Sequence, residues 1–131
     1  MVIDSHVLLW WLTDPGRLSV VAGDFLDACL KGKRGGTICA VSLWELEWKR
    51  RRGKLPLAGS VREWLPRLRK FNSVELSETS VEHWLLAAEL VWEHGDPADR
   101  LIAAAALERG VAVLTKDGRF HAPDSPVEAV W

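Results

Sequence analysis

The sequence predicts an α/β fold with a parallel sheet. Short apolar runs of strand length alternate with longer segments of helical periodicity, which is the pattern of repeated strand–helix units. Val111–Thr115 is a continuous apolar run, typical of a strand that is buried on both faces. The 131 residues and the hydrophobic content of 48% fit a single domain, residues 1–131, with a core of its own.

The first part of the chain is predicted to hold one strand and two helices. Met1–Ile3 is a short apolar strand that ends at Asp4. A helix follows over Ser5–Leu12, and the Asp-Pro-Gly sequence at 14–16 ends it. The next helix covers Ser19–Lys31, with its serine as the N-cap.

A second strand and a capped helix are predicted in the middle of the chain. Two glycines at 35 and 36 form a turn before Thr37–Val41, which is predicted to be a buried strand. We expect Ser42 to cap the following helix, because Glu45 three residues later completes a capping box. That helix runs towards Gly53. A further helix, Val61–Lys70, is expected to be interrupted near its proline.

The second half begins with a predicted edge strand, Ser73–Leu76, and a long helix, Glu78–Glu93. Apolar residues recur along this helix at the spacing of one buried face. They are Val81, Trp84, Leu85, Ala88, Val91 and Trp92.

The next helix, Pro97–Arg109, is capped by Asp96 and ended by Gly110. It is apolar almost all round, so we expect it to be buried against the sheet. Pro126–Trp131 is the last short strand.

The composition excludes several classes of protein. With 17 Lys and Arg against 18 Asp and Glu, the net charge of -1 argues against a wholly basic nucleic-acid binder and an acidic disordered tail. Cys29 and Cys39 fit no metal-ligand spacing and are expected to be reduced core residues. No signal peptide is recognisable, and Val7–Leu12 is too short to span a membrane. We therefore expect a soluble, cytoplasmic protein without membrane association.

Four carboxylates occupy similar places in the predicted layout. Asp4 follows the first strand, Glu45 lies in the first turn of the next helix, and Asp117 comes two residues after the Val111–Thr115 strand. These positions are carboxyl ends of strands, where parallel sheets bind ligands. Asp99 lies at the start of the buried helix, and its placement in the same cleft is an inference.

Each carboxylate also has a plainer explanation. Asp4, Glu45 and Asp99 would suit helix capping and the helix dipole, and Asp117 would suit a surface loop. However, Asp99 has apolar neighbours and needs a partner, and no Lys or His recurs beside all four acids. A divalent cation such as Mg²⁺ satisfies all four, and such a site fits metal-assisted phosphodiester hydrolysis.

Four segments of the chain, in order, resemble the motifs of PIN-domain ribonucleases, in particular the VapC toxins of type II toxin–antitoxin systems. They are Val2–Trp10 (with Ser5 where the family usually has Thr), Val41–Leu46 continuing through Lys49–Leu55, Asp96–Ala103 and Leu114–Asp117. The resemblance covers essentially the whole chain.

The resemblance implies a PIN-like three-layer α/β/α fold with helices on both faces of the parallel sheet. It also implies a Mg²⁺ or Mn²⁺ site formed by Asp4, Glu45, Asp99 and Asp117. Asp4 and Asp99 match the usual direct ligands, Glu45 the acid that orients or activates water, and Asp117 the most variable acid. Thr115 would line the site as a hydrogen-bonding neighbour.

Three neighbouring residues are interpreted as structural. Asp96 fits the role of helix cap, Arg100 that of a salt-bridging residue, and His6 that of a packing or capping residue more than a general base.

Lys49–Lys54 is the densest run of charge. Cations suit the end of a helix, so a solvated helix terminus is one interpretation. The other is an RNA-binding strip beside the metal cleft, in which Lys49, Arg50 and Arg52 contact substrate together with Thr115. Further basic residues that extend this strip are Arg62, Arg67, Arg69 and Lys70.

The eight tryptophans are the compositional oddity. Five lie at helical spacing and are expected in the core, although base stacking and partner contacts stay open. They are Trp10, Trp44, Trp48, Trp84 and Trp92. The resemblance also implies a homodimer and a cognate antitoxin, whose C-terminal segment would lie in an apolar groove among the early helices. Trp11 and Trp48 are candidates for that groove.

The favoured hypothesis is a metal-dependent endoribonuclease toxin that an antitoxin silences. One alternative is a catalytically silent PIN-like module that binds RNA or protein and no divalent metal. Another is a phosphoacceptor receiver domain, to which Thr115 and Lys116 point. Its acid spacing does not fit, and the chain has no Asp at the end of a central third strand.

Overall fold

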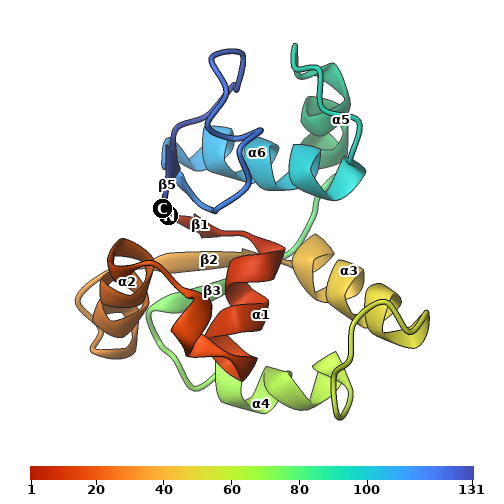
Figure 1. Ribbon diagram of the computed structural model, residues 1–131. Helices are drawn as coiled ribbons and strands as arrows, with labels where there is room; N and C mark the ends of the chain where they lie inside the picture. The colour runs from red at the N-terminus through yellow and green to blue at the C-terminus, as the bar shows by residue number, and fades with distance from the viewer.

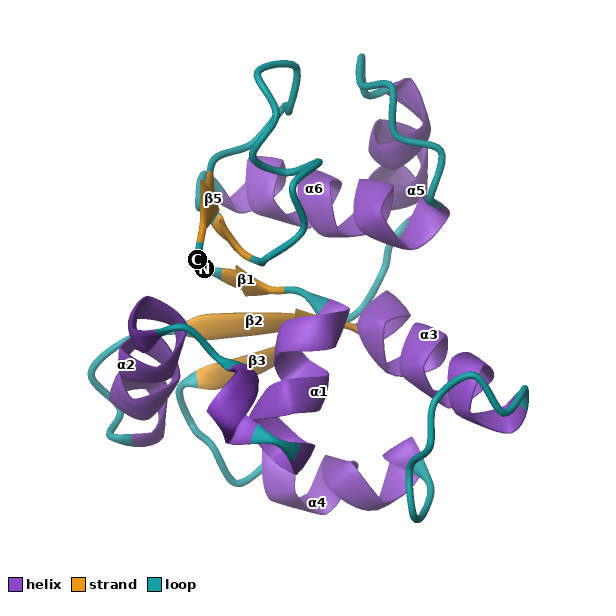
Figure 2. Ribbon diagram, viewed as in Figure 1, coloured by secondary structure: helices purple, strands orange, loops and turns teal.

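A five-stranded sheet forms the middle layer of the structure, and every strand pair in it is parallel (Figures 1 and 2). The computed structural model describes residues 1–131. The strand order is β3-β2-β1-β4-β5. The strands are β1 (Val2–Ile3), β2 (Gly36–Cys39), β3 (Val74–Ser77), β4 (Val113–Leu114) and β5 (Ala129–Val130). The predicted parallel sheet and the edge position of β3 are confirmed.

Helices cover both faces of the sheet, which confirms the three-layer α/β/α fold. In Figure 1, α5 and α6 lie above the sheet, α1, α2 and α4 lie below it, and α3 extends from one end. The helices are α1 (Ser5–Thr13), α2 (Val20–Leu30), α3 (Ala40–Arg51), α4 (Leu65–Leu68), α5 (Val81–Glu89) and α6 (Pro97–Arg109), with 3-10 turns at Pro15–Arg17 and Val61–Trp64. None of them combines the length and the apolar character needed to cross a membrane.

Neighbouring residues of each central strand face opposite cores, as the pleat of a strand requires. Val2 and Val113 belong to the core that α6 covers, whereas Ile3 and Leu114 pack with residues of α1 and α2. The predicted burial of α6 is confirmed, because the six side chains of Leu101–Ala106 are at most 1% exposed.

The predicted caps of α2 and α6 are present. The Ser19 side chain accepts a hydrogen bond from the Ala22 N–H at 3.1 Å, and the Asp96 side chain accepts one from the Ala98 N–H at 2.8 Å. Gly110 ends α6 with a φ of 60°, a left-handed conformation in which a Cβ would be strained.

The predicted capping box at Ser42 is wrong. Strand β2 ends at Cys39 and α3 begins directly at Ala40, so Ser42 lies inside the helix and is fully buried. Glu45 is consequently in the second turn of α3 and not in the first. This shift carries the Glu45 side chain away from the helix end and leaves it free for another partner.

The predicted helix Glu78–Glu93 is too long at both ends, and the predicted buried face is wrong. Helix α5 begins after Ser80, whose side chain accepts a hydrogen bond from the His83 N–H. Its buried residues are His83 and Ala87, which face α6. Most of the expected core residues of this segment are exposed: Val81, Trp84, Leu85, Ala88 and Val91, whereas Trp92 is buried.

Other expectations have mixed outcomes. Val61–Lys70 is a 3-10 turn followed by the short α4, and both C-terminal strands are shorter than predicted. Of the five tryptophans expected in the core, Trp10 and Trp92 are buried, but Trp44 and Trp84 are more than half exposed. Two further core residues, Cys29 and Cys39, are free thiols as expected. Burial raises the pKa of the Cys39 thiol to about 11, so this thiol stays protonated.

Candidate metal centre

The order of the strands defines where a ligand would bind. The chain runs outward from β1 through β2 to β3, then returns to the other side of β1 for β4 and β5. The crevice at such a reversal, at the carboxyl ends of the strands, is the usual ligand site of an open α/β sheet. Asp4 directly follows β1, and its N–H donates to the Leu114 carbonyl at 3.2 Å. Thr115 directly follows β4, so both residues lie at this reversal.

Asp4 is a buried carboxylate that does not cap its helix. It occupies the N-cap position of α1 and is 3% exposed, yet its side chain makes no capping hydrogen bond. Instead, the Thr115 hydroxyl donates to Asp4 Oδ2, and His6 Nδ1 lies 3.0 Å from the same oxygen. Capping therefore does not explain Asp4.

Thr115 links two of the predicted acids. Its hydroxyl donates to Asp4 and accepts a hydrogen bond from the Asp117 N–H at 3.0 Å. Because Thr115 is fully buried, its contacts within the protein fix how Asp4 and Asp117 are placed. His6 supports the same arrangement, since its Nε2 accepts from the Lys116 N–H at 3.1 Å. The His6 proton is therefore on Nδ1, facing Asp4, and both ring nitrogens serve to hold the site.

Asp99 has the most strongly perturbed carboxyl group of the site. It lies in the first turn of α6, where Asp96 already provides the cap. Burial, and then the charges of Asp4, Asp96, Glu45 and Asp117, raise the pKa of Asp99 to about 8. The metal-free protein therefore keeps a proton on Asp99 at neutral pH.

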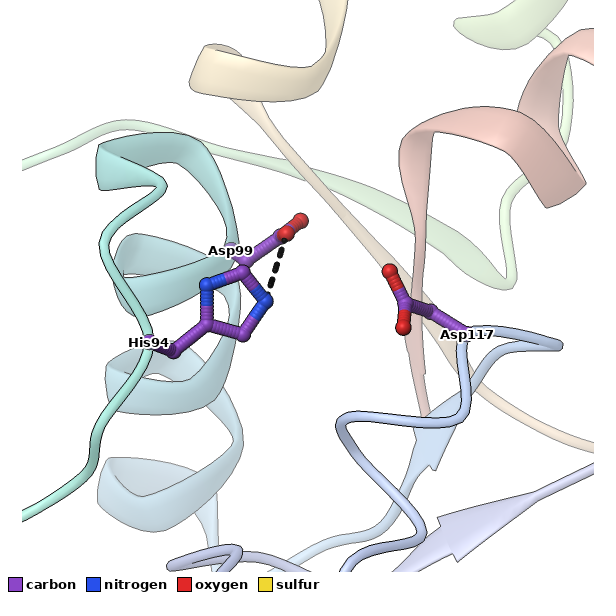
Figure 3. A group of neighbouring side chains, drawn as sticks. All are labelled: His94, Asp99 and Asp117. Atoms are coloured by element: carbon purple, nitrogen blue, oxygen red, sulfur yellow. Dashed lines mark ion pairs between the residues drawn. The ribbon is translucent and has the colours of Figure 1, made fainter.

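His94 is a site residue that the sequence analysis missed. Its Nε2 lies 3.0 Å from Asp99 Oδ2 (Figure 3), and its Nδ1 accepts a hydrogen bond from the Asp96 N–H. The ring proton is therefore on Nε2, beside the carboxylate. This nitrogen is buried and its N–H is not well directed at any acceptor. His94 therefore packs against Asp99 without a well-directed hydrogen bond, and because its Nε2 carries the proton in this tautomer, it is not a free metal ligand.

Arg100 holds the segment that carries His94. The hydrogen-bond partners of its guanidinium are backbone carbonyls and include no carboxylate, so the expected salt bridge is wrong. Arg100 donates to five carbonyls, those of Ala87, Ala88, Leu90, Trp92 and His94. These bonds end α5 and fold residues 90–95 back over the start of α6.

His94, Asp99 and Asp117 meet in one small space. One ligand-type atom from each lies within 4.8 Å of the others, and Figure 3 shows Asp117 facing the pair from the loop after β4. Two carboxylates at this spacing repel each other, and this repulsion adds to burial, which is the main cause of the raised pKa of Asp99. A hard divalent cation would replace the Asp99 proton and neutralise the repulsion, so the donor set fits Mg²⁺ or Mn²⁺.

Glu45 completes the acidic edge. It is 9% exposed in α3 and forms an ion pair with Lys49 one turn later. Burial lowers the pKa of Lys49, but the hydrogen bond to Glu45 and the charges of Glu45, Asp96 and Asp99 outweigh it and raise the pKa overall. Lys49 is therefore a firmly charged cation at the border of the carboxylate group.

The remaining basic residues of the run have different environments. Arg50 makes two hydrogen bonds to the Glu47 carboxylate, at 2.9 and 2.8 Å, and Arg51 pairs with the same group. Arg52 instead lies over the Trp48 ring at 4.1 Å from its centroid. The structure thus brings Lys49 to the acids and Arg52 to an aromatic surface, whereas Arg50 is held by Glu47.

Fold and site together define a class: parallel α/β proteins whose carboxylates gather at the carboxyl edge of the sheet and suit a divalent cation. The model of the PIN domain family matches residues 1–125. The chain belongs to the PIN-domain family.

Individual relatives agree with this assignment. The chain is 35% identical over 133 residues to Ribonuclease VapC22 of Mycobacterium tuberculosis (strain ATCC 25618 / H37Rv), covering 100% of this chain and 98% of the relative. The fold of the present chain is similar to that of a chain of VapBC2 from Rickettsia felis bound to a promoter DNA fragment. The TM-score is 0.65 at 15% sequence identity, and the match covers 99% of this chain and 98% of that chain. The fold is also similar to that of a chain of FitAcB from Neisseria gonorrhoeae (TM-score 0.64, 17% identity, 99% and 96%).

Proposed function

We propose that this chain, as one PIN domain over residues 1–131, is a divalent-metal-dependent endoribonuclease and the toxin of a type II toxin–antitoxin pair. The observation that carries the proposal is the convergence of Asp4, Asp99 and Asp117 at the strand-order reversal, with the pKa of Asp99 raised to about 8 by burial and by its acidic neighbours. The relative named as a ribonuclease over the full length supports the reaction.

The acids would bind the metal ion, and Thr115 would keep them in place. Asp4, Asp99 and Asp117, with Glu45 at the border, would hold Mg²⁺ or Mn²⁺. When bound, such an ion polarises the phosphate and lowers the pKa of water. Thr115, whose hydroxyl contacts Asp4 and Asp117, keeps these carboxylates in place.

The RNA backbone would meet the cations beside the acids. Glu45 orients water, and Lys49 is close enough to exchange its ion pair with Glu45 for one with a phosphate. Arg52 provides a second positive charge over Trp48. Arg50 would contribute only after leaving Glu47, to which it makes two hydrogen bonds. Because these two hydrogen bonds must first break, Arg50 is the weakest of the three proposed contacts.

Two protein partners complete the proposal. The cognate antitoxin would use the early helices, where a cavity of about 430 Å³ is lined by Trp11 of α1, by residues of α2 and by Arg67 of α4. The solved VapBC2 complex supports a partner of this kind. A homodimer would use the outer face of α5, where Val81 and Leu85 are exposed. The reaction would take place in the cytoplasm.

The test is cleavage of a labelled single-stranded RNA by the purified protein in Mg²⁺. We expect Asp4→Asn and Asp99→Asn each to lower the rate more than about 100-fold, beyond the range for an outer-shell residue. Asp24→Asn, at an exposed position of α2, is the matched control and should retain full activity. Equal rates in wild type and in both site variants, or full activity in EDTA, would refute the assignment.

A further inference from the structure

One cavity of the protein borders the acidic site and has no role in the function described so far. It has a volume of about 520 Å³ and lies between α3, α5 and the start of α6. Three tryptophans, Trp44, Trp48 and Trp84, supply much of its wall, and Pro97 and Leu101 of α6 also line it. This size is within the range of pockets that hold small organic ligands.

The cavity borders the candidate metal centre. Glu45 and Lys49 line it, and so does the helix cap Asp96. The same Glu45 and Asp96 charges act on the Asp99 carboxyl group, so the cavity and the acids share one border. A molecule whose reacting phosphate lies at the carboxylates would place its next chemical group in this cavity.

The aromatic wall is presented to solvent. Trp44 is 59% exposed and Trp84 is 53% exposed, although both are large apolar side chains. The Trp44 and Trp48 ring centroids are 6.0 Å apart with a tilt of 30°, so they do not cover each other by parallel stacking. An indole face of this kind binds a flat aromatic group well, and a nucleobase is the flat group that RNA offers.

Positive charge lies on the Trp48 side of the aromatic wall, and the acids Glu45 and Asp96 line the same cavity. Arg52 lies 4.1 Å and Lys54 5.6 Å from the Trp48 ring centroid, and Lys49 lines the cavity itself. An aromatic surface with cations beside Trp48 and carboxylates towards the metal centre matches a nucleotide, which joins an aromatic base to an anionic phosphate. A purely apolar protein partner would not need these charges.

We propose that this cavity binds an unpaired nucleobase of the RNA, adjacent to the phosphate that is cleaved, by stacking on Trp44. The phosphates that flank this base then lie against Lys49, Arg52 and Lys54. The inference rests on the proposed ribonuclease function and adds to it a binding site for one base on Trp44. A base within a duplex is stacked on its neighbours and cannot enter this cavity.

The competing occupant is a second copy of this chain. The exposed stripe of α5 that includes Val81 and Leu85 continues from Trp84, so self-association would also cover part of this region. Variants at Trp44 on α3 and at Leu85 on α5 separate the two occupants. Trp44→Ala should weaken the binding of the RNA base, and Leu85→Glu should weaken self-association.

The experiment measures RNA binding in EDTA, where cleavage does not take place. The probes are a single-stranded RNA 12-mer that carries 2-aminopurine, an abasic ribose-phosphate strand of the same length, and the RNA paired with its complement. For wild type, we expect binding of the base-bearing strand to exceed that of the abasic strand by about 5- to 150-fold, the range for one stacked base. In Trp44→Ala, this ratio should fall to about one while binding of the abasic strand is unchanged. Trp44→Phe should retain part of the preference for the base-bearing strand.

The outcomes distinguish each failure. An unchanged ratio in Trp44→Ala, with the variant folded by circular dichroism, overturns the base site. A change from dimer to monomer in Trp44→Ala without any change in RNA binding assigns the surface to a second copy and also overturns it. If the base preference is lost in Leu85→Glu and kept in Trp44→Ala, the base site on Trp44 is likewise overturned. RNA cleavage in Mg²⁺, measured on the same preparations, reports separately on the ribonuclease proposal.

Discussion

The ionisation of Asp99 makes the stability of the metal-free protein depend on pH, and removing this carboxyl group should remove that dependence. Burial and four neighbouring acids raise its pKa from 3.8 to about 8 in the folded protein. The unfolded chain loses the proton near the ordinary pKa, whereas the folded protein retains it. Stability therefore falls as the pH rises from about 4 to about 8. Asp99→Asn carries no such proton and should not show this fall.

The size of the effect follows from the width of this window. Each pH unit inside it changes the free energy of unfolding by at most about 1.4 kcal/mol. Between pH 5 and pH 7, wild type should lose up to about 2.7 kcal/mol relative to Asp99→Asn. For a domain of this length the relative change in Tm is on the order of 10 °C. Comparing two pH values cancels any constant effect of the amide on packing.

Urea unfolding in EDTA at pH 5, 6 and 7 measures this difference, with Asp24→Asn as the control that should follow wild type. Saturating Mn²⁺ should abolish the fall in wild type, because the cation replaces the Asp99 proton. A constant difference in unfolding free energy between wild type and Asp99→Asn across these pH values would refute the reasoning.

Three further variants test the contacts around the acids. His94→Ala should weaken Mn²⁺ binding by about 10- to 100-fold, with partial retention in His94→Gln, because the ring packs against Asp99 from outside the ligand set; isothermal titration measures it, and equal affinity in all three proteins would exclude the role. Thr115→Val should cost about 1–3 kcal/mol in urea unfolding and lower RNA cleavage, because Asp4 loses a buried donor. Arg100→Met should destabilise by more than about 2 kcal/mol, since it leaves several carbonyls of residues 87–94 without a donor; retention of wild-type stability would show that these bonds are replaceable.

Local patterns in the sequence were sufficient to place two of the acids at one edge of the sheet. Asp4 ends a strand and Asp117 follows a buried strand, whereas Asp99 follows a helix, so its place in the same cleft could only be inferred. The boundary between β2 and α3 was not predictable in this way. No breaker separates Cys39 from Ala40, and the helix starts without a side-chain cap.

Helix α5 shows where periodicity fails. Its apolar residues have correct helical spacing, but His83 decides which face is buried. The His83 ring contacts the Glu108 carboxylate at 2.7 Å and the Leu101 carbonyl at 2.9 Å, both on α6. The small side chain of Ala87 then allows close packing against an alanine-rich helix. The larger apolar side chains remain outside, where a sequence pattern alone would not place them.

His94 was missed for a related reason. The sequence predicts a helix that runs almost to this residue, whereas the structure ends α5 at Glu89. The hydrogen bonds from Arg100 to the carbonyls of this segment turn it over α6. This arrangement is a tertiary effect, and only the short spacing from His94 to the capping Asp96 would have pointed to it.

Titration of the purified protein with Mn²⁺ at pH 7, followed by calorimetry, tests most directly whether these carboxylates form a metal centre. We expect saturable binding by wild type and by Asp24→Asn, accompanied by release of the Asp99 proton, and loss of binding in Asp4→Asn and Asp99→Asn. Binding of equal affinity in all four proteins would contradict the account, as would the absence of binding in a wild-type protein that cleaves RNA.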